Sequence, residues 1–408
     1  VLLDLINNQV HEDHEYMSRN PEWFRTACKC GDDAIGCGWS QRPFDCMFQP
    51  YLPDINWNVA GAERQFIEDA LYWLDTFDVD GFRVDAVKHV EVNSIYNMRA
   101  EVARRFEQGG TRVYMLGETA VGEFDRGTFA GETFRDGFEW IDAYTGPAAL
   151  DGQFDFPTRH NLADGLLNDT MGLDEVERQL RKAETRYRPG SRHVRFLNGH
   201  DNPRIASVAA RDPRLGCTWD RGCRDDRLPP SSYADPVVTG RLRRALTVLG
   251  TLPGVPFLYS GDEVGMGGGA DPDMRRNMVF ADPQLAPVQM PLWGGNGPSS
   301  EQLALFAWAQ KVGQARAGSI ALRRGQRVPL VSEASFWAYG YKGPGDTFAV
   351  VVINRGGDTR GRVLPAGALG SLEGKALRSA LGTGSARVEA TGIAVDLAPG
   401  EADIFVSP

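Results

Sequence analysis

The chain has 408 residues, of which 42% are hydrophobic and 24% charged, and this length allows two or three domains. Its formal net charge is -10, so it repels phosphate backbones, and nucleic acid is not expected as a partner. No apolar run approaches the roughly 20 residues that span a bilayer, so no membrane partner is expected either. The basic cluster of Arg241, Arg243 and Arg244 is interpreted as the solvated face of a helix.

Six cysteines fall in two groups: Cys28, Cys30, Cys37 and Cys46, and then Cys217 and Cys223. The first group could bind zinc, but neither group contains a C-x-x-C pair and both counts are even, which favours disulfides. Cys217 with Cys223 is the natural local pair, whereas the first group allows three pairings that the sequence does not separate. Disulfides imply an oxidising compartment, so a secreted, extracellular or periplasmic protein is expected.

From residue 1 to about residue 318, short apolar runs alternate with amphipathic stretches. Strands are predicted at 1–6, 79–85, 112–118, 193–198 and 255–259, and helices at 62–77, around 95–106, at 173–186, around 242–249 and at 301–317. The first strand reads as the middle of a buried strand, which suggests that an N-terminal part precedes it. Strands that alternate with helices of this length imply βαβ units and a parallel sheet.

Two segments depart from this alternation. Residues 9–60 are irregular and rich in cysteine, glycine, proline and aromatic residues. From about residue 325 short strands, for example 335–341, 347–354 and 402–406, are separated by glycine-rich turns. The second segment therefore predicts an all-β module, a sandwich with a packing role.

Three acidic residues end three of the predicted parallel strands: Asp85, Glu118 and Asp201. Strand ends of a parallel barrel converge on one rim, and like charges that meet there are costly unless they do chemistry. Arg83 lies two residues before Asp85, so both side chains point to the same side of the strand, and a guanidinium there keeps the carboxylate ionised. One ionised and one protonated carboxyl group are what glycoside hydrolysis needs.

Four segments then become specific. GFRVDAVKH (81–89), GET (117–119), NGHD (198–201) and LPDIN (52–56) resemble, in order and spacing, segments of the α-amylase family of glycoside hydrolases. The opening DLINNQ and the later GDE and ADPDMR are also similar to that family. The resemblance implies an α/β fold: a (β/α)8-type TIM barrel (residues 1–8 and 61–324) with a short cysteine-rich domain B insertion (9–60) and a C-terminal antiparallel β-sandwich (325–408).

The resemblance also implies a role for individual residues. Asp85 would be the nucleophile, Glu118 the general acid/base, and Asp201 the carboxylate that binds and distorts the −1 sugar. Further substrate-binding positions would be Arg83, His200, Lys88, His89, Gln9, Asp271 and Arg275. Asn8, Asp54 and the carbonyl of His89 would hold a structural Ca²⁺, and all three are oxygen donors of the kind that a hard cation prefers.

Two features depart from the family pattern. Gln9 stands where the family has a sugar-binding histidine, so one hydrogen bond is kept and a titratable charge is lost. The first two βα units have no counterpart before Val1, and a six-stranded barrel would expose two sheet edges.

The expected protein is a monomer that acts as a retaining, endo-acting hydrolase of α-1,4-glucans, on polysaccharide or maltooligosaccharide. The alternatives are a transglycosylase, a cyclomaltodextrin-processing enzyme or a catalytically impaired glucan-binding protein.

Overall fold

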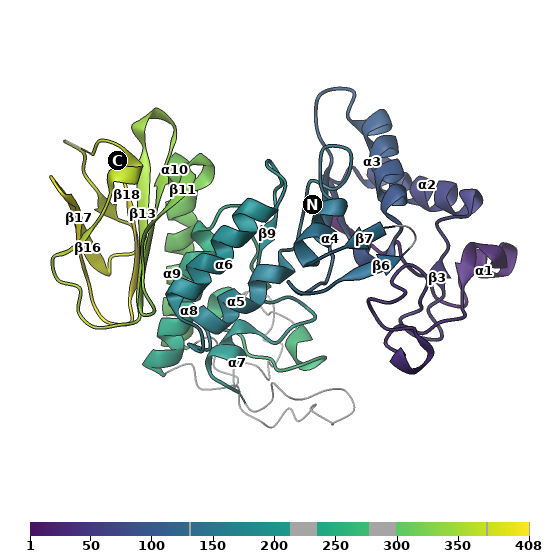
Figure 1. Ribbon diagram of the computed structural model, residues 1–408, viewed down its shortest axis with the longest axis horizontal. Coiled ribbons are helices and arrows are strands. Elements are labelled where there is room, and N and C mark those ends of the chain that lie inside the picture. The colour runs from purple at the N-terminus through teal and green to yellow at the C-terminus, as the bar shows by residue number, and fades with distance from the viewer. Residues whose placement is uncertain (130–131, 213–234, 277–298, 373, 408) are drawn as a thin grey trace, which may run out of the picture. The chain divides into compact units, whose positions relative to one another are not determined.

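The computed structural model describes residues 1–129, 132–212, 235–276, 299–372 and 374–407 (Figure 1). These residues form two compact units. Unit 1 comprises residues 1–158 and 182–194, and unit 2 comprises residues 159–181 and 195–408. The predicted pair Cys217 and Cys223 lies outside the described residues.

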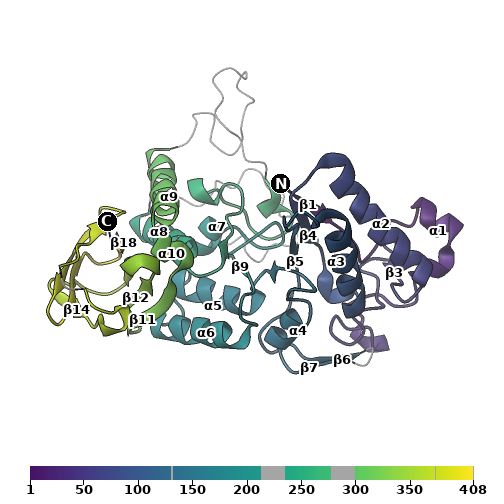
Figure 2. The same cartoon turned by 90° about the horizontal axis from the view of Figure 1, so that it is seen from above.

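The core of unit 1 is a four-stranded parallel sheet in the order β1-β4-β5-β8. The strands are β1 (Leu2–Leu5), β4 (Gly81–Val84), β5 (Tyr114–Gly117) and β8 (Gly152–Gln153). Helix α2 (Ala60–Phe77) precedes β4 and α3 (Val92–Phe106) connects β4 to β5. Figure 2 shows β1, β4 and β5 side by side with both helices next to them. The predicted βαβ units are therefore confirmed in this part of the chain.

The two helices pack through the apolar faces that their periodicity predicts. On α2 the buried side chains include Ile67, Leu71 and Leu74, at spacings of three and four residues. They share one hydrophobic cluster with Phe82 and Val84 of β4, which are completely buried. Each such side chain contributes about 1.5–3 kcal/mol when it is removed from water, so this cluster fixes β4 in place.

Strand β1 does not have the burial that its sequence suggested. It was expected to be the middle of a buried strand, but it lies at the edge of the described sheet, paired with β4 alone. Leu2 is 38% exposed and Ile6 is 56% exposed. An apolar run indicates a strand, but burial depends on what packs against it.

The irregular segment between β1 and α2 is stapled by disulfides. It contains α1 (Glu15–Arg19), the 3₁₀ turns η1 (Pro21–Trp23) and η2 (Asp33–Ile35), and the short pair β2 (Phe24–Arg25) with β3 (Asp54–Ile55). Cys28 pairs with Cys37, and Cys30 pairs with Cys46. The disulfides predicted for this group are confirmed, and their connectivity is the part that the sequence left open.

Several elements after β5 were not anticipated. A hairpin of β6 (Gly127–Phe129) and β7 (Glu132–Phe134) leads into α4 (Gly137–Ala143), whose first turn is capped by the Asp136 carboxylate. Helices α5 (Phe156–Leu166) and α6 (Leu173–Arg186) each begin in one unit and end in the other. Only α6 had been predicted, because its apolar face is strongly periodic, whereas the hairpin and α4 are short and α5 is weakly periodic.

Unit 2 contains a helical layer and a β module. Its helices are α7 (Ile205–Ala209), α8 (Pro236–Thr251), α9 (Ser300–Gly318) and α10 (Ile320–Arg324), with 3₁₀ turns η6 (Asp262–Val264) and η7 (Asp273–Arg275). Two short strands, β9 (Val194–Arg195) at the boundary between the units and β10 (Val255–Pro256), pair with each other. The strand predicted at 255–259 is thus present but shorter.

The C-terminal module is antiparallel, as predicted. One sheet has the order β11-β12-β13-β18-β15 and the other the order β14-β17-β16. Their strands are β11 (Gln326–Ser332), β12 (Phe336–Lys342), β13 (Phe348–Asn354), β14 (Arg362–Leu364), β15 (Arg378–Ser379), β16 (Gly384–Glu389), β17 (Gly392–Leu397) and β18 (Ala402–Val406).

Strand β12 is buried on both faces, and its alternation shows why. Phe336 and Ala338 belong to the cluster between the two sheets, whereas Trp337 and Tyr339 belong to the cluster that includes α8 and α9. The hydroxyl groups of Tyr339 and Thr251 are hydrogen-bonded at 2.6 Å. The module therefore packs against the helices of its own unit, in agreement with the packing role expected from the sequence.

The basic cluster on α8 corrects a sequence interpretation. Arg244 is 6% exposed and donates to Asp169 Oδ1 at 2.8 Å, and Arg241 donates to Asp169 Oδ2 at 2.7 Å. These two arginines are paired with a carboxylate rather than solvated, because the turn before α6 places Asp169 between them.

None of the helices in the described ranges is both long and apolar enough to cross a bilayer.

Candidate active site

The predicted nucleophile and acid/base lie at the ends of two neighbouring parallel strands in unit 1. The backbone N–H of Asp85 donates to Leu5 O at 2.9 Å, and that of Glu118 donates to Val84 O at 2.9 Å. Both residues thus extend the parallel hydrogen-bond pattern one step beyond β4 and β5. This brings their carboxylates to the same edge of the sheet, where parallel α/β folds collect functional groups.

Arg83 connects the two carboxylates. Its Nη1 donates to Asp85 Oδ1 at 2.6 Å, and its Nη2 lies 3.0 Å from Glu118 Oε2. The same Nη1 donates to Asp4 Oδ1 at 2.6 Å, because Asp4 is opposite Arg83 in the β1–β4 register. We call Asp4, Arg83, Asp85 and Glu118 the first carboxylate cluster. The sequence predicted the contact with Asp85 but missed Asp4, whose only signal was its place in the opening segment.

Burial and charge act on Arg83 in opposite directions. Desolvation lowers the pKa of Arg83, but the carboxylates of Glu118, Asp85 and Asp4 raise it by more, so the net shift is upward. The guanidinium therefore stays charged at any working pH. One fixed cation among three carboxylates holds them together without neutralising them, and the side chains of Asp85 (21% exposed) and Glu118 (15% exposed) stay partly accessible.

A strained residue supports Glu118. Ala86 has φ of 45°, in the left-handed region that a non-glycine residue adopts at a cost of about 1–2 kcal/mol. In this conformation its N–H points at Glu118 Oε2, 3.3 Å away. Such strain is concentrated at functional sites, and here it aims a hydrogen-bond donor at the predicted acid/base.

The next two residues that the sequence proposed for sugar binding are buried. Lys88 is 7% exposed, and its Nζ donates to Ala120 O at 3.1 Å. Burial lowers the pKa of Lys88, against the attraction of Asp125 and Glu118. His89 is 4% exposed, with its ring against Phe48, and burial lowers the pKa of His89 to about 3. The roles of both residues in substrate binding stay predictions.

Unit 2 brings together four other predicted residues, which we call the second carboxylate cluster: His200, Asp201, Asp271 and Arg275. Arg275 Nη2 donates to Asp201 Oδ1 at 2.8 Å, while His200 Nε2 lies 3.0 Å from Asp201 Oδ2. Arg275 Nε also lies 2.9 Å from Asp271 Oδ1. The prediction that this cluster and the first one meet at one rim stays a prediction.

The residues proposed for calcium fit a hard cation. Asn8 and Asp54 are each 1% exposed and lie on adjacent chain segments, since Ile55 N donates to Asn8 O at 2.9 Å. Asn8 Oδ1 and Asp54 Oδ1 are buried and have no hydrogen-bond partner among the described residues, and neither has Gln9 Oε1. Burial raises the pKa of Asp54 well above its usual range, despite the nearby Arg25. Arg25 alone does not compensate the burial of this carboxylate, and a bound cation would supply further positive charge.

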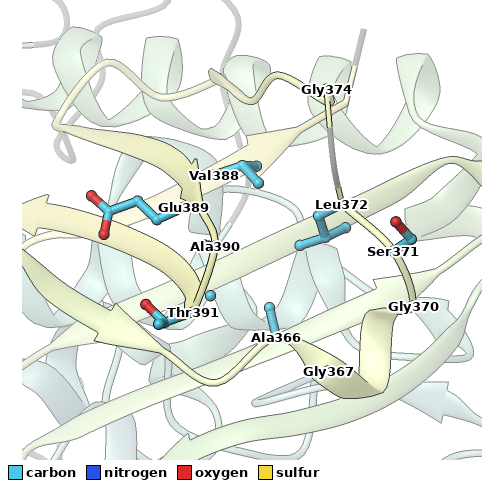
Figure 3. Close-up of a pocket in the computed structure, with 11 residues that line it drawn as sticks. Ala366, Gly367, Gly370, Ser371, Leu372, Gly374, Val388, Glu389, Ala390 and Thr391 are labelled. Carbon is cyan, nitrogen blue, oxygen red and sulfur yellow. The ribbon is translucent and has the colours of Figure 1, made fainter.

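The β module offers a further hollow, of about 660 Å³, between the turn before β15 and the β16–β17 turn (Figure 3). Among the described residues that line it none is aromatic, and most are glycine, alanine, serine or threonine. Glu389 is the one acidic residue among the described lining residues. These residues offer neither an aromatic stacking surface nor a pair of carboxylates, so we do not take the hollow as the candidate catalytic site.

A partly accessible carboxylate pair bridged by one guanidinium, on adjacent strands of a parallel sheet, is the kind of site that glycoside hydrolases with two catalytic carboxyl groups need. Residues 32–221 match the family model described as the α-amylase catalytic domain. The matched residues thus resemble the catalytic domain of the α-amylase family of glycoside hydrolases, in agreement with the motifs.

The chain is also similar to a curated relative in sequence and to solved structures in fold. The chain is 24% identical over 331 residues to a cyclomaltodextrinase from Geobacillus thermopakistaniensis, covering 79% of this chain and 45% of that relative. The chain thus spans less than half of the length of this curated relative. An Anoxybacillus α-amylase has the same fold, with a TM-score of 0.75 and 23% identity over 100% of this chain and 75% of that one. For an α-amylase from Geobacillus thermoleovorans, complexed with acarbose, the TM-score is 0.73, with 22% identity over 100% and 77%.

Proposed function

We propose that this chain carries the catalytic carboxylates of a retaining hydrolase of α-1,4-glucosidic bonds, acting inside starch-like glucans or maltooligosaccharides. The observation that carries the proposal is the bridge from Arg83 to both Asp85 and Glu118. One guanidinium that touches both carboxylates keeps them close, and retaining glycosidases hold their two carboxyl groups about 5 Å apart, whereas inverting enzymes need a wider gap for water.

The proposed reaction has two steps. Asp85 attacks the anomeric carbon while Glu118 gives its proton to the leaving glycosidic oxygen, which departs as a free 4-hydroxyl. The sugar is then bound to Asp85 as a glycosyl ester. Glu118, now ionised, takes a proton from water, and the resulting nucleophile displaces Asp85 and restores both carboxyl groups. Asp201 keeps the role that the family resemblance implies, binding sugar hydroxyls.

Hydrolysis of a reducing-end-blocked maltoheptaoside by the full chain, with calcium present, tests this function. Asp85→Asn should abolish turnover and Glu118→Gln should reduce it by about 10³-fold or more, since each loses one of two essential carboxyl groups. The products should keep the α configuration, which NMR of fresh digests detects. Glucan binding without any turnover would favour the impaired binding protein, and β-anomeric products would exclude retention.

A second activity is supported by the relative named cyclomaltodextrinase. A cyclomaltodextrin-processing enzyme or a transglycosylase would use the same carboxylates. The first would differ in the substrate that it accepts, and the second in the acceptor, a sugar hydroxyl in place of water, that attacks the glycosyl ester. Equal molar rates on β-cyclodextrin and on soluble starch would favour the first of these. Products longer than the starting maltoheptaoside would indicate transfer to sugar rather than to water.

The calcium site and the cell compartment belong to the same proposal. Asn8, Asp54 and the carbonyl of His89 are proposed to hold Ca²⁺, which would join the irregular segment to the chain after β4 and take no part in bond cleavage. The two disulfides support a secreted or periplasmic protein, because such bonds persist in oxidising compartments.

A further inference from the structure

Arg25 lies in the same buried region as the proposed calcium ligands. Its Nη1 donates to the backbone carbonyl of Phe44 and, at 3.1 Å, to Asp54 Oδ2. Its Nη2 donates to Asn56 Oδ1 at 2.6 Å and to Glu91 Oε1. The first three acceptors belong to the disulfide-stapled segment 9–60, and the fourth, Glu91, is the residue before α3. One guanidinium therefore joins that segment to the chain that follows β4.

The charges of Arg25 and the two carboxylates that it contacts do not balance. Asp54 is 1% exposed and Glu91 is 8% exposed, so two buried carboxylates share a single arginine. Each carboxylate uses one oxygen for Arg25, and the other oxygens, Asp54 Oδ1 and Glu91 Oε2, are buried and have no hydrogen-bond partner among the described residues. Asn8 Oδ1 is in the same condition. Buried polar atoms are normally satisfied, so these three oxygens leave coordination capacity that a cation would use.

We propose that Arg25 is a permanent positive charge at the calcium site. Its guanidinium and a bound Ca²⁺ together would balance the negative charges of Asp54 and Glu91. Glu91 is then part of the charge balance at this site, although the family resemblance gives it no role. The inference rests on the calcium site proposed above and does not depend on catalysis. Arg25 holds the stapled segment to the start of α3 when calcium is absent, and calcium adds to that hold.

The proposal predicts opposite effects for two substitutions. In Arg25→Gln two buried carboxylates lose the guanidinium that they share, so the calcium-free protein is destabilised, and the repulsion between that guanidinium and Ca²⁺ disappears. Calcium should then raise the melting temperature by more than it does in the parent chain. In Glu91→Gln the remaining Asp54–Arg25 pair is neutral, so calcium should raise the melting temperature by less than in the parent chain.

The measurement is thermal unfolding of the full chain in EDTA and in calcium chloride, with calcium affinity from isothermal titration. In EDTA we expect Arg25→Gln to melt on the order of 10 °C lower, as for the loss of one partner of a buried ion pair. Calcium should recover most of that loss, with about tenfold tighter binding. If Arg25→Gln folds only in calcium, the proposal is supported too. Arg25→Lys keeps the positive charge and loses the fork, so its calcium shift should be smaller than that of Arg25→Gln even where its stability in EDTA falls.

Arg19→Gln is the matched control, because Arg19 lies in the same segment and pairs with Glu15 at the surface, where both side chains are more than half exposed. It should leave the calcium response unchanged. An equal or smaller calcium shift in Arg25→Gln than in the parent chain would overturn the proposal. So would the absence of any calcium shift in all variants, even if the chain hydrolyses glucans, and this separates the inference from the proposed function.

Discussion

A buried hydrogen bond joins Thr119, which directly follows Glu118, to Gln153 on the neighbouring strand β8: the threonine hydroxyl donates to Gln153 Oε1. The amide of Gln153 in turn donates to Ile141 O at 2.6 Å and to Thr145 Oγ1 at 3.1 Å. Thr119, Gln153 and Thr145 are all fully buried. The end of the strand that carries the predicted acid/base is thus tied to the next strand and to α4.

Gln153→Leu should loosen this connection. The Thr119 hydroxyl would be left buried without its acceptor, at a cost of about 1–3 kcal/mol in the free energy of unfolding, measured with urea. Because Glu118 is adjacent, kcat should fall by about tenfold while KM changes little. Gln65→Leu is the control, since Gln65 bonds to Asp69 on the outer turn of α2, and it should shift both quantities little. An unchanged kcat in Gln153→Leu would show that the network does not position Glu118.

Arg83→Lys should show that the fork of the guanidinium, and not only its charge, holds the first carboxylate cluster. Lysine has one charged atom and cannot bridge Asp85 and Glu118 with the same two-pronged geometry. We expect kcat/KM on an aryl maltooligosaccharide to fall by about 10²-fold or more, or about 3 kcal/mol. Asp4→Asn keeps both of those bridges and should lose less than tenfold. Parent-like activity in Arg83→Lys would contradict the bridging role.

Asp262 should make stability depend on pH. This carboxyl group is 1% exposed, and burial raises its pKa to about 7, against the hydrogen bond from Asn198 and the charge of Arg204, which lower it. The unfolded value is about 3.9, so the folded protein binds the proton more tightly. The contribution of Asp262 to the free energy of unfolding is therefore fully present below about pH 4. It is lost as the pH rises toward 7, by roughly 4 kcal/mol in total.

Asp262→Asn removes this titration and can still accept the Asn198 bond. The difference in unfolding free energy between Asp262→Asn and the parent chain should grow in favour of the variant between pH 4 and pH 7, as measured with urea at each pH. Asp358→Asn, which changes an exposed carboxylate paired with Arg360, should leave the slope unchanged. Parallel curves for the parent chain and Asp262→Asn would show that Asp262 is charged throughout.

Glu177 should matter for stability and not for catalysis. Its carboxylate accepts from Arg327 at 2.7 and 3.1 Å and from Trp337 Nε1 at 2.8 Å, and both charged side chains are almost fully buried. Glu177→Gln removes the charge of the buried Glu177–Arg327 pair, and breaking such a pair costs about 3–5 kcal/mol. Thermal unfolding should show a lower melting temperature. The KM of the protein that remains folded should be unchanged, because Glu177 is not among the predicted substrate-binding residues. Glu175→Gln, which breaks an exposed pair with Arg178 on the same helix, should cost less than about 1 kcal/mol.

The predicted elements show where sequence information is reliable. Helix α6 was predicted at 173–186 and occupies Leu173–Arg186, because its apolar residues recur at spacings of three and four, as in Leu173, Val176 and Leu180. The strands that end at Asp85 and Glu118 were found for the same local reason. The hairpin β6–β7 and helices α4 and α5 were missed because they are short or weakly periodic, and β1 was wrongly taken as buried.

The sequence by itself determined the alternation of strands and helices around β4 and β5, the disulfide character of the first cysteine group, and the positions of Asp85 and Glu118 after two parallel strands. These properties follow from local periodicity and from motifs a few residues long. The tertiary structure decided which cysteines pair, that Asp4 shares Arg83, that Arg25 lies between Asp54 and Glu91, and that Glu177 meets Arg327 from 150 residues away. Such partners are chosen by packing between distant segments, and no local pattern records which segments will meet.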